Sequence, residues 1–185
     1  MSRLPPPDTA GLTPRQREVH DAIARGPRGH VRGPLALWLH RPELAAAAQA
    51  LGQYCRYDSS LPPRLSELAI LVTGRVFGSE FEWQTHKPIA LAAGLAPEIV
   101  EAIRCNRRPV FTDAAEEIVH DFARAAHETR RVDDALYARA MEVLGQDAVV
   151  DLVGLLGYYT LISLTINVFD VPPPGDDPRP DLADV

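Results

Sequence analysis

The chain has 185 residues and a formal net charge of -6 at pH 7, and 46% of its residues are hydrophobic and 24% are charged. This length and composition indicate one globular domain with enough chain to bury a real core. Because the net charge is negative and no long run of Lys and Arg occurs, the sequence argues against a nucleic-acid-binding protein.

The two cysteines, Cys55 and Cys105, lie far apart in the sequence. Their spacing cannot form a CxxC redox pair or a thiolate zinc site within one chain. Two reduced thiols in a cytosolic protein are therefore expected. The N-terminal MSRLPPPDTAGL lacks the apolar core of a secretory signal, so we expect a cytoplasmic location.

The predicted elements are all helical, because Ala and Leu are abundant and no strand pattern occurs. Capping residues, Pro and Gly predict helices over approximately 14–25, 42–52, 63–77, 80–94, 97–108, 113–130, 134–144 and 147–169. We expect an irregular arm over 1–12, a single all-α domain over 13–171, and a flexible Pro- and Asp-rich tail over 172–185.

The polar and aromatic stretch QYCRYDSS, residues 53–60, separates the helix predicted over 42–52 from the one predicted over 63–77. Its two tyrosines and its arginine could line a pocket, with Tyr54 as a candidate for substrate contact. A surface turn with half-packed tyrosines is the simpler interpretation. The sequence leaves both readings open.

One carboxylate, Glu67, lies within the strongly apolar stretch 61–77. On a helical wheel it falls between Ile70, Leu71 and Gly74, where a charge is costly unless it is paired or hydrogen-bonded. An exposed i,i+3 pair with Arg64 is the alternative. The wheel alone does not decide between them.

The next predicted helix carries Glu82, Trp83 and His86, and Glu82 and His86 are four residues apart and share a helical face. Ser79 and Glu82 also have the spacing of a capping box, which would use the Glu82 carboxylate locally. Alternatively, Glu82 fixes the tautomer and raises the pKa of His86. If the two helices form a hairpin, Glu67 could face this pair.

Two later stretches have simpler interpretations. His120 and His127 lie seven residues apart near several carboxylates, but a solvated helix face fits better than a metal site, because their spacing is not typical of metal ligands.

The stretch 148–169 is long enough to span a membrane but contains Asp and Asn. We expect it to be a buried helix, covered in part by a second copy of the chain.

The residues of this central region resemble the carboxymuconolactone decarboxylase family, whose relatives include alkylhydroperoxidases with the same helical core. The resemblance spans roughly residues 45–171. It is carried by Glu67, Gly78, the Glu82-Trp83-x-x-His86 run, the Ala90-x-x-x-Gly94 that follows with Pro97-Glu98-Ile99, and the flanking RLSELAILVTG and GYYTLISLTINVFDVP.

The resemblance implies an all-α, alkylhydroperoxidase-like helical bundle in which a central helical hairpin carries the site. It implies homo-oligomers, often trimers or hexamers, a small-molecule substrate, and neither a metal nor an organic cofactor. The peroxidase branch has a CxxC before its histidine. Ser79 and Glu82 occupy those two positions here, which leaves that thiol chemistry without a nucleophile.

The resemblance to the decarboxylase branch makes a cofactor-free decarboxylase or related lyase, acting on a small carboxylated lactone or similar acid, the first hypothesis. His86 would be the acid/base, Glu82 its orienting partner and Glu67 a second acid/base. Arg75 could bind the substrate carboxylate, and Trp83 and Tyr54 could shape the pocket. A peroxidase-type oxidoreductase and a non-catalytic, ligand-binding helical oligomer are the alternatives.

Overall fold

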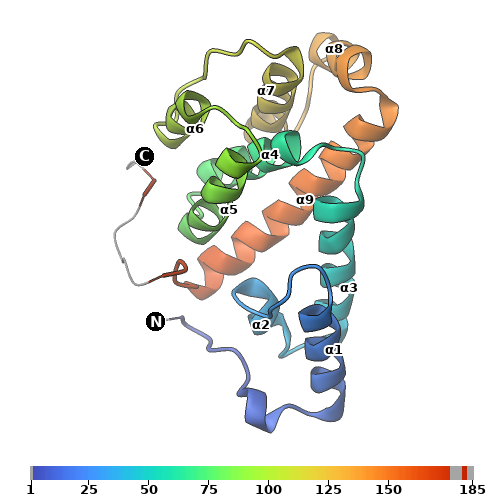
Figure 1. Cartoon of the computed structure of the whole chain (residues 1–185), viewed down its shortest axis with the longest axis vertical. Helices are drawn as coiled ribbons and strands as arrows, with labels where there is room; N and C mark the ends of the chain where they lie inside the picture. Colours follow the sequence, from blue (N-terminus) through green and yellow to red (C-terminus); the bar gives the residue numbers. More distant parts are fainter. Residues whose placement is uncertain (1, 176–180, 183–185) are drawn as a thin grey trace.

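The computed structural model describes residues 2–175 and 181–182. Within these residues the protein is all-α and contains no strand. The nine α-helices in this part of the chain are α1 (Pro14–Arg25), α2 (Pro34–Trp38), α3 (Pro42–Gln53), α4 (Pro63–Val76), α5 (Glu80–Ala92), α6 (Pro97–Arg104), α7 (Ala114–Thr129), α8 (Asp134–Leu144) and α9 (Gln146–Phe169) (Figure 1).

The predicted helices agree with these bounds to within a few residues. Thr13 forms a capping box with Gln16 at the start of α1, and the side chains of Asp113 and Asp133 cap α7 and α8. Two short elements add to the helices, a 3₁₀ turn η1 (Thr9–Gly11) and a π-helical turn η2 (Tyr54–Asp58). The η2 turn falls in the stretch for which the sequence left a pocket open.

Helix α4 is the centre of the fold, and α5, α7 and α9 pack around it. Every residue from Leu65 to Arg75 is buried, so α4 is covered on all sides. Helices α4 and α5 form the predicted hairpin, since only Phe77, Gly78 and Ser79 separate them. Gly78 adopts a positive φ of 59° there, a conformation that glycine adopts without a steric penalty.

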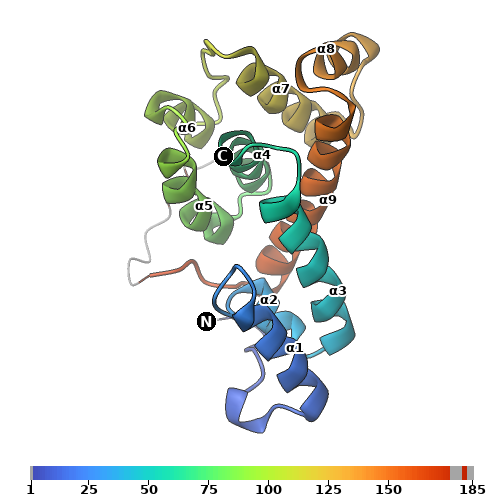
Figure 2. The same ribbon diagram turned by 45° about the vertical axis from the view of Figure 1, so that its right-hand side comes forward.

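Helix α9 runs diagonally through the molecule, with the α4–α5 hairpin on one side and α3 on the other (Figures 1 and 2). Among the described helices it alone is long and apolar enough to cross a membrane, and 61% of its most apolar window is buried inside the fold. Its inner face supplies core residues from Val149 to Ile166. This is the packing of a core helix, as expected from the sequence.

Apart from the η1 turn, the described part of the N-terminal arm is irregular, and it lies against the end of α9. The backbone N–H of Arg3 and the hydroxyl of Ser2 both donate to the carbonyl of Phe169, each at 2.8 Å. Most of the predicted flexible tail, residues 176–180 and 183–185, lies outside the described residues. Asp181 and Leu182 are described, and they contact α5 instead of lying loose.

Candidate active site

The α4–α5 hairpin places His86 between two carboxylates. Nδ1 of His86 lies 2.6 Å from Oε2 of Glu67, and Nε2 lies 3.3 Å from Oε2 of Glu82. All three residues are buried, with exposed fractions of 5% or less. The three residues that the sequence singled out therefore do converge on one point.

The local sequence explains how the hairpin closes. A Cβ added to Gly74 on α4 would lie 3.6 to 3.8 Å from the backbone of Ser79 and Trp83 and from Cβ of Glu82, so the small residue admits α5 at van der Waals distance. The alternative partner of Glu67 is engaged elsewhere, because Arg64 pairs with Asp113 and Glu116 on α7. The interpretation of Glu67 as a buried and paired carboxylate is thus confirmed.

The predicted capping box at the start of α5 is wrong. Ser79 occupies the N-cap position, but its side chain makes no capping hydrogen bond, and its buried hydroxyl has no partner. The reason is that the Glu82 carboxylate turns to the imidazole of His86 instead of reaching back to the N-cap. Helix α5 gives up a local stabilising contact to supply a group to the site.

The two carboxylates determine the charge of His86. Burial disfavours the imidazolium, but the negative charge of Glu67 and the hydrogen bonds with both carboxylates outweigh it, so the pKa of His86 is raised above its ordinary value. A histidine with a raised pKa keeps its proton to higher pH than an ordinary histidine does, and it can deliver that proton as a general acid.

Tyr159 of α9 adds a hydroxyl beside the imidazole. Its Oη lies 3.4 Å from Nε2 of His86, and the two rings meet edge to face with centroids 5.2 Å apart. Burial raises the pKa of Tyr159 well above its ordinary value, so the phenol stays neutral and can donate a hydrogen bond.

Arg56, from the η2 turn, brings a guanidinium to the same place. Its Nη2 lies 3.9 Å from Oε1 of Glu67, and its buried Nε has no hydrogen-bond partner. Asp151 of α9 holds this turn at both ends, because it accepts a 2.6 Å hydrogen bond from Tyr54 and bonds of 2.7 and 2.6 Å from the backbone and hydroxyl of Ser60. The turn is therefore fixed in place and presents a donor without a partner.

These groups line a cavity of about 150 Å³. Glu67 lies behind His86 and outside the lining, whereas Glu82 and His86 face the cavity. Its other lining residues are basic or aromatic to a large extent and include Arg28, His30, Arg32, Arg56, Tyr57, Phe81, Thr85, Tyr158 and Tyr159. Burial lowers the pKa of His30, and the positive charges of Arg32, Arg28 and Arg56 lower it further. The arginines therefore make the electrostatic potential in the cavity positive. The cavity is thus suited to a small organic anion.

Comparisons with known proteins agree with this geometry. Residues 42–125 match the sequence profile of the carboxymuconolactone decarboxylase family. The matched residues include the whole α4–α5 hairpin that carries His86 and its two carboxylates. Comparison with curated protein sequences gave no match.

Solved structures extend the similarity in fold to nearly the whole chain. A peroxidase-related protein with an alkylhydroperoxidase AhpD core, from Ralstonia eutropha JMP134, aligns with a TM-score of 0.75 and 18% identity over 94% of this chain and 92% of its own. The debrominase Bmp8 aligns with a TM-score of 0.73 and 14% identity over 92% and 91%. At such identities the likeness shows the alkylhydroperoxidase-like fold.

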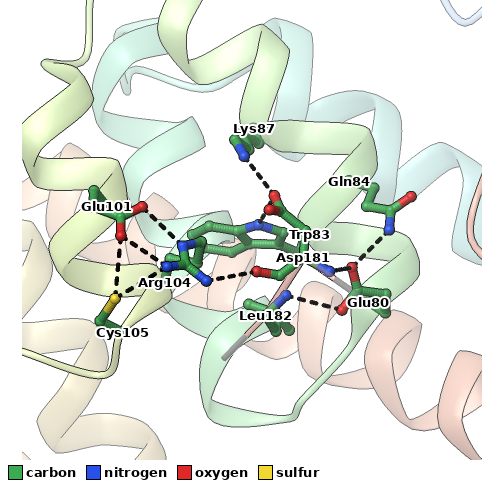
Figure 3. Close-up of polar contacts among 9 residues, drawn as sticks. All are labelled: Glu80, Trp83, Gln84, Lys87, Glu101, Arg104, Cys105, Asp181 and Leu182. Atoms are coloured by element: carbon green, nitrogen blue, oxygen red, sulfur yellow. Dashed lines mark hydrogen bonds and ion pairs between the residues drawn. The ribbon is translucent and has the colours of Figure 1, made fainter. Parts of the chain in front are cut away.

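The three substrate-contact candidates from the sequence lie outside the cavity. Tyr54 is half exposed and bonds Asp151, and Arg75 is buried in α4 without lining the cavity. Trp83 is fully buried on the neighbouring face of α5, where its indole N–H donates to Asp181 at 2.8 Å (Figure 3). Each departs from the expectation because its side chain is used in packing or anchoring.

The sequence identified Glu67, Glu82 and His86 but not Tyr159, Arg28 or Arg32 as members of the site. The Tyr-Arg-Tyr cluster of 54–57 was a signal for Arg56 and Tyr57, although it was equally compatible with a surface turn. No local pattern distinguishes Tyr159, since it lies in a long apolar helix. Its place beside His86 depends on how α9 crosses the hairpin.

Proposed function

We propose that the protein is a cofactor-free enzyme of proton transfer at carbon, a decarboxylase or related carbon–carbon lyase acting on a small carboxylated lactone or similar acid. One observation carries this proposal: the buried His86, held by Glu67 and Glu82 with a raised pKa, faces a cavity rich in arginine. A general acid and an anion-binding wall thereby share one small space.

The chemistry follows from the charges. In decarboxylation the bond between carbon and the carboxylate breaks, and its electron pair moves into a conjugated carbonyl to give a dienolate. Arg56 and the Tyr159 hydroxyl would stabilise the negative oxygen. The His86 imidazolium would protonate the carbon, and carbon dioxide would leave. His86 is then reprotonated from water, with Glu67 and Glu82 favouring its charged form.

The excess of positive charge supports an anionic substrate. Three arginines line the cavity together with the His86 imidazolium, and Glu67 and Glu82 are the carboxylates that face this histidine. An arginine guanidinium matches the geometry of a carboxylate with two parallel hydrogen bonds. The unpartnered Nε of Arg28 and that of Arg56 are donors that such a group can satisfy.

The aromatic lining supports a small, flat and unsaturated substrate. Phe81, Tyr57 and Tyr158 form much of the wall. A Cys-to-Ala variant of the debrominase Bmp8, which shares the fold with a TM-score of 0.72 and 15% identity, covering 91% of this chain and 89% of its own, was solved in complex with 2,3,4-tribromopyrrole. Binding of a small ring in that relative fits the cavity size here.

A peroxidase-type oxidoreductase is the less favoured function, because neither cysteine lines the cavity. Cys55 is buried next to Arg56, and burial raises the pKa of its thiol, which makes it a poorer nucleophile. Cys105 lies on the far side of α6, against Glu101.

Turnover of γ-carboxymuconolactone, followed by ultraviolet absorbance and by release of carbon dioxide, tests the proposal. We expect turnover by the wild type and its loss in His86→Asn. If neither carboxymuconolactone nor a panel of other small unsaturated β-keto and lactone acids releases carbon dioxide, the lyase proposal is wrong. Hydroperoxide reduction with a thiol reductant, measured in parallel, would then favour the peroxidase alternative.

We also propose that the protein acts as a homo-oligomer. The outer face of α9 carries a continuous apolar stripe of exposed residues, Val150, Val153, Leu161, Leu164 and Val168, with Gly154 and Gly157 between them. An exposed stripe of this kind marks a protein interface, and a second copy would cover it. Size-exclusion chromatography with light scattering would contradict this if the protein ran as a 20.3 kDa monomer.

A further inference from the structure

The outer side of α5 carries a second polar cluster that the catalytic proposal does not use. Glu80, Trp83 and Lys87 lie on one face of the helix, at spacings of three and four residues, and Arg104 of α6 lies beside them. All four converge on the backbone and side chain of Asp181 and on the backbone of Leu182 (Figure 3).

The Asp181 side chain is held by two donors. Its Oδ2 accepts hydrogen bonds from Nε1 of Trp83 at 2.8 Å and from Nζ of Lys87 at 2.5 Å. The hydrogen bonds from Lys87 and Trp83 outweigh the opposing effect of burial, so the pKa of Asp181 is lowered. A carboxylate is therefore the group that this site fits.

The backbone of the segment is recognised as well. Glu80 accepts from two successive N–H groups, Asp181 at 2.6 Å and Leu182 at 3.2 Å, and Arg104 donates to the Asp181 carbonyl at 3.0 Å. The side chain of Leu182 packs against the core. The site thus binds both the backbone and the side chains of the segment, as a protein that binds an extended peptide does.

The receiving residues are themselves held in place. Gln84 donates to Glu80 at 2.7 Å, one turn along the helix, and Glu101 holds Arg104 with two 2.8 Å hydrogen bonds. The polar groups of the site are thereby arranged by their own neighbours, which lowers the entropic cost of binding the segment.

We propose that this face of α5 and α6 is a docking site for the C-terminal segment of the same chain, and that Asp181 is the residue it recognises. The segment then acts as a strap on α5, because it contacts Glu80, Trp83 and Lys87, which lie on the face of the helix next to the one that carries Glu82 and His86. With this segment in place Trp83 is fully buried, and its indole N–H donates to Asp181.

The test follows the indole N–H of Trp83 in the full-length, ¹⁵N-labelled protein by NMR, independently of any enzymatic activity. In Asp181→Ala we expect the Trp83 resonance to move and its hydrogen exchange to accelerate by roughly tenfold or more, since a charged hydrogen bond is lost. The indole of Trp38, which donates to Thr165 in the core, is the internal reference and should not change.

Two further variants make the result specific. Glu80→Gln weakens the acceptor of the two backbone N–H groups and should accelerate Trp83 exchange in the same direction. Asp134→Asn removes an exposed carboxylate at the start of α8 and should leave it unchanged. Equal Trp83 exchange in wild type and Asp181→Ala would overturn the proposal, as would an exchange rate that rises on dilution, which would mean that another copy supplies the segment.

Discussion

Helices α5 and α7 both carry histidines that are wholly or partly buried, yet their surroundings give these residues opposite acid–base properties. On α5, two carboxylates meet His86 and its pKa is raised. On α7, burial lowers the pKa of His120 and of His127, although His120 has a carboxylate neighbour in Asp121. Burial alone makes a histidine neutral, and a second carboxylate is what keeps it charged.

The comparison also corrects one sequence-based interpretation. The α7 face with the two histidines was expected to be solvated, but His120 is only 4% exposed and packs against Phe111, and Nε2 of His127 lies 2.9 Å from the hydroxyl of Thr73. Among the described residues no group of three or more His, Cys, Asp or Glu is placed to hold a metal ion. These histidines therefore serve the packing of α7 on its neighbours.

The largest expected effect is that of removing the imidazole from α5. In His86→Asn, turnover should fall by about 10²- to 10⁴-fold, the usual contribution of a general acid. The variant leaves two buried carboxylates without their partner and should unfold more readily, so circular dichroism must accompany the kinetics. His127→Asn is the matched control and should keep its activity. A folded His86→Asn protein with full turnover would contradict the assignment.

The next effect in size concerns Arg56, whose guanidinium lines the cavity together with His86. Replacing Arg56 by Met should raise KM by roughly ten- to a hundredfold, because a charged hydrogen bond to the substrate is lost. Arg64→Met removes another partly buried arginine, whose partners are Asp113 and Glu116, and should lower stability without changing KM. An equal KM in the wild type and in Arg56→Met would show that Arg56 does not bind the substrate.

Glu67→Gln should make His86 resemble the histidines of α7. Because the Glu67 charge raises the pKa of His86, its removal should lower that pKa, and the loss of activity on the alkaline side of the pH profile should begin at a lower pH. The His86 contribution to stability, present below its unfolded pKa and lost as pH rises through the raised folded pKa, should shrink in parallel. An unchanged pH profile would argue against this coupling.

The smallest effect is expected on α7 itself. His127→Gln should cost about 1 kcal/mol of stability at neutral pH, from the hydrogen bond with Thr73. Because burial lowers the pKa of His127 in the fold, wild-type stability is lost as pH falls through the unfolded pKa toward the folded one. Chemical denaturation at neutral and acidic pH should therefore show a smaller difference between the two proteins in acid.

The boundaries of the helices were predictable because each depends on residues next to it in the sequence. Thr13-Pro14, Asp113 and Asp133 are strong starting signals. A capping side chain bonds the free N–H groups of the first turn, so it is favoured at the residue where a helix begins. The core of the site was predictable for a related reason. The i,i+4 spacing of Glu82 and His86 and one hairpin suffice to bring Glu67 to them.

The rest of the site depends on packing between distant segments. Tyr159 reaches His86 from α9, and Arg56 approaches Glu67 from a π-helical turn whose position is set by Asp151. The wrong capping box has the same origin, since local spacing favoured Ser79 as the partner of Glu82 and the folded chain supplied His86. A sequence pattern gives the available partners of a carboxylate but not the one that the tertiary structure provides.

The central claim is that His86 is an imidazolium at neutral pH while the histidines of α7 are neutral. The most direct measurement is a pH titration of the imidazole nitrogens by ¹⁵N NMR in the wild-type protein, with His86 and His127 assigned from their Asn and Gln variants. The account predicts that His86 is still protonated at pH 7, above the ordinary histidine pKa of about 6.5, and that His127 is not. A His86 that is already neutral at pH 6 would contradict the account.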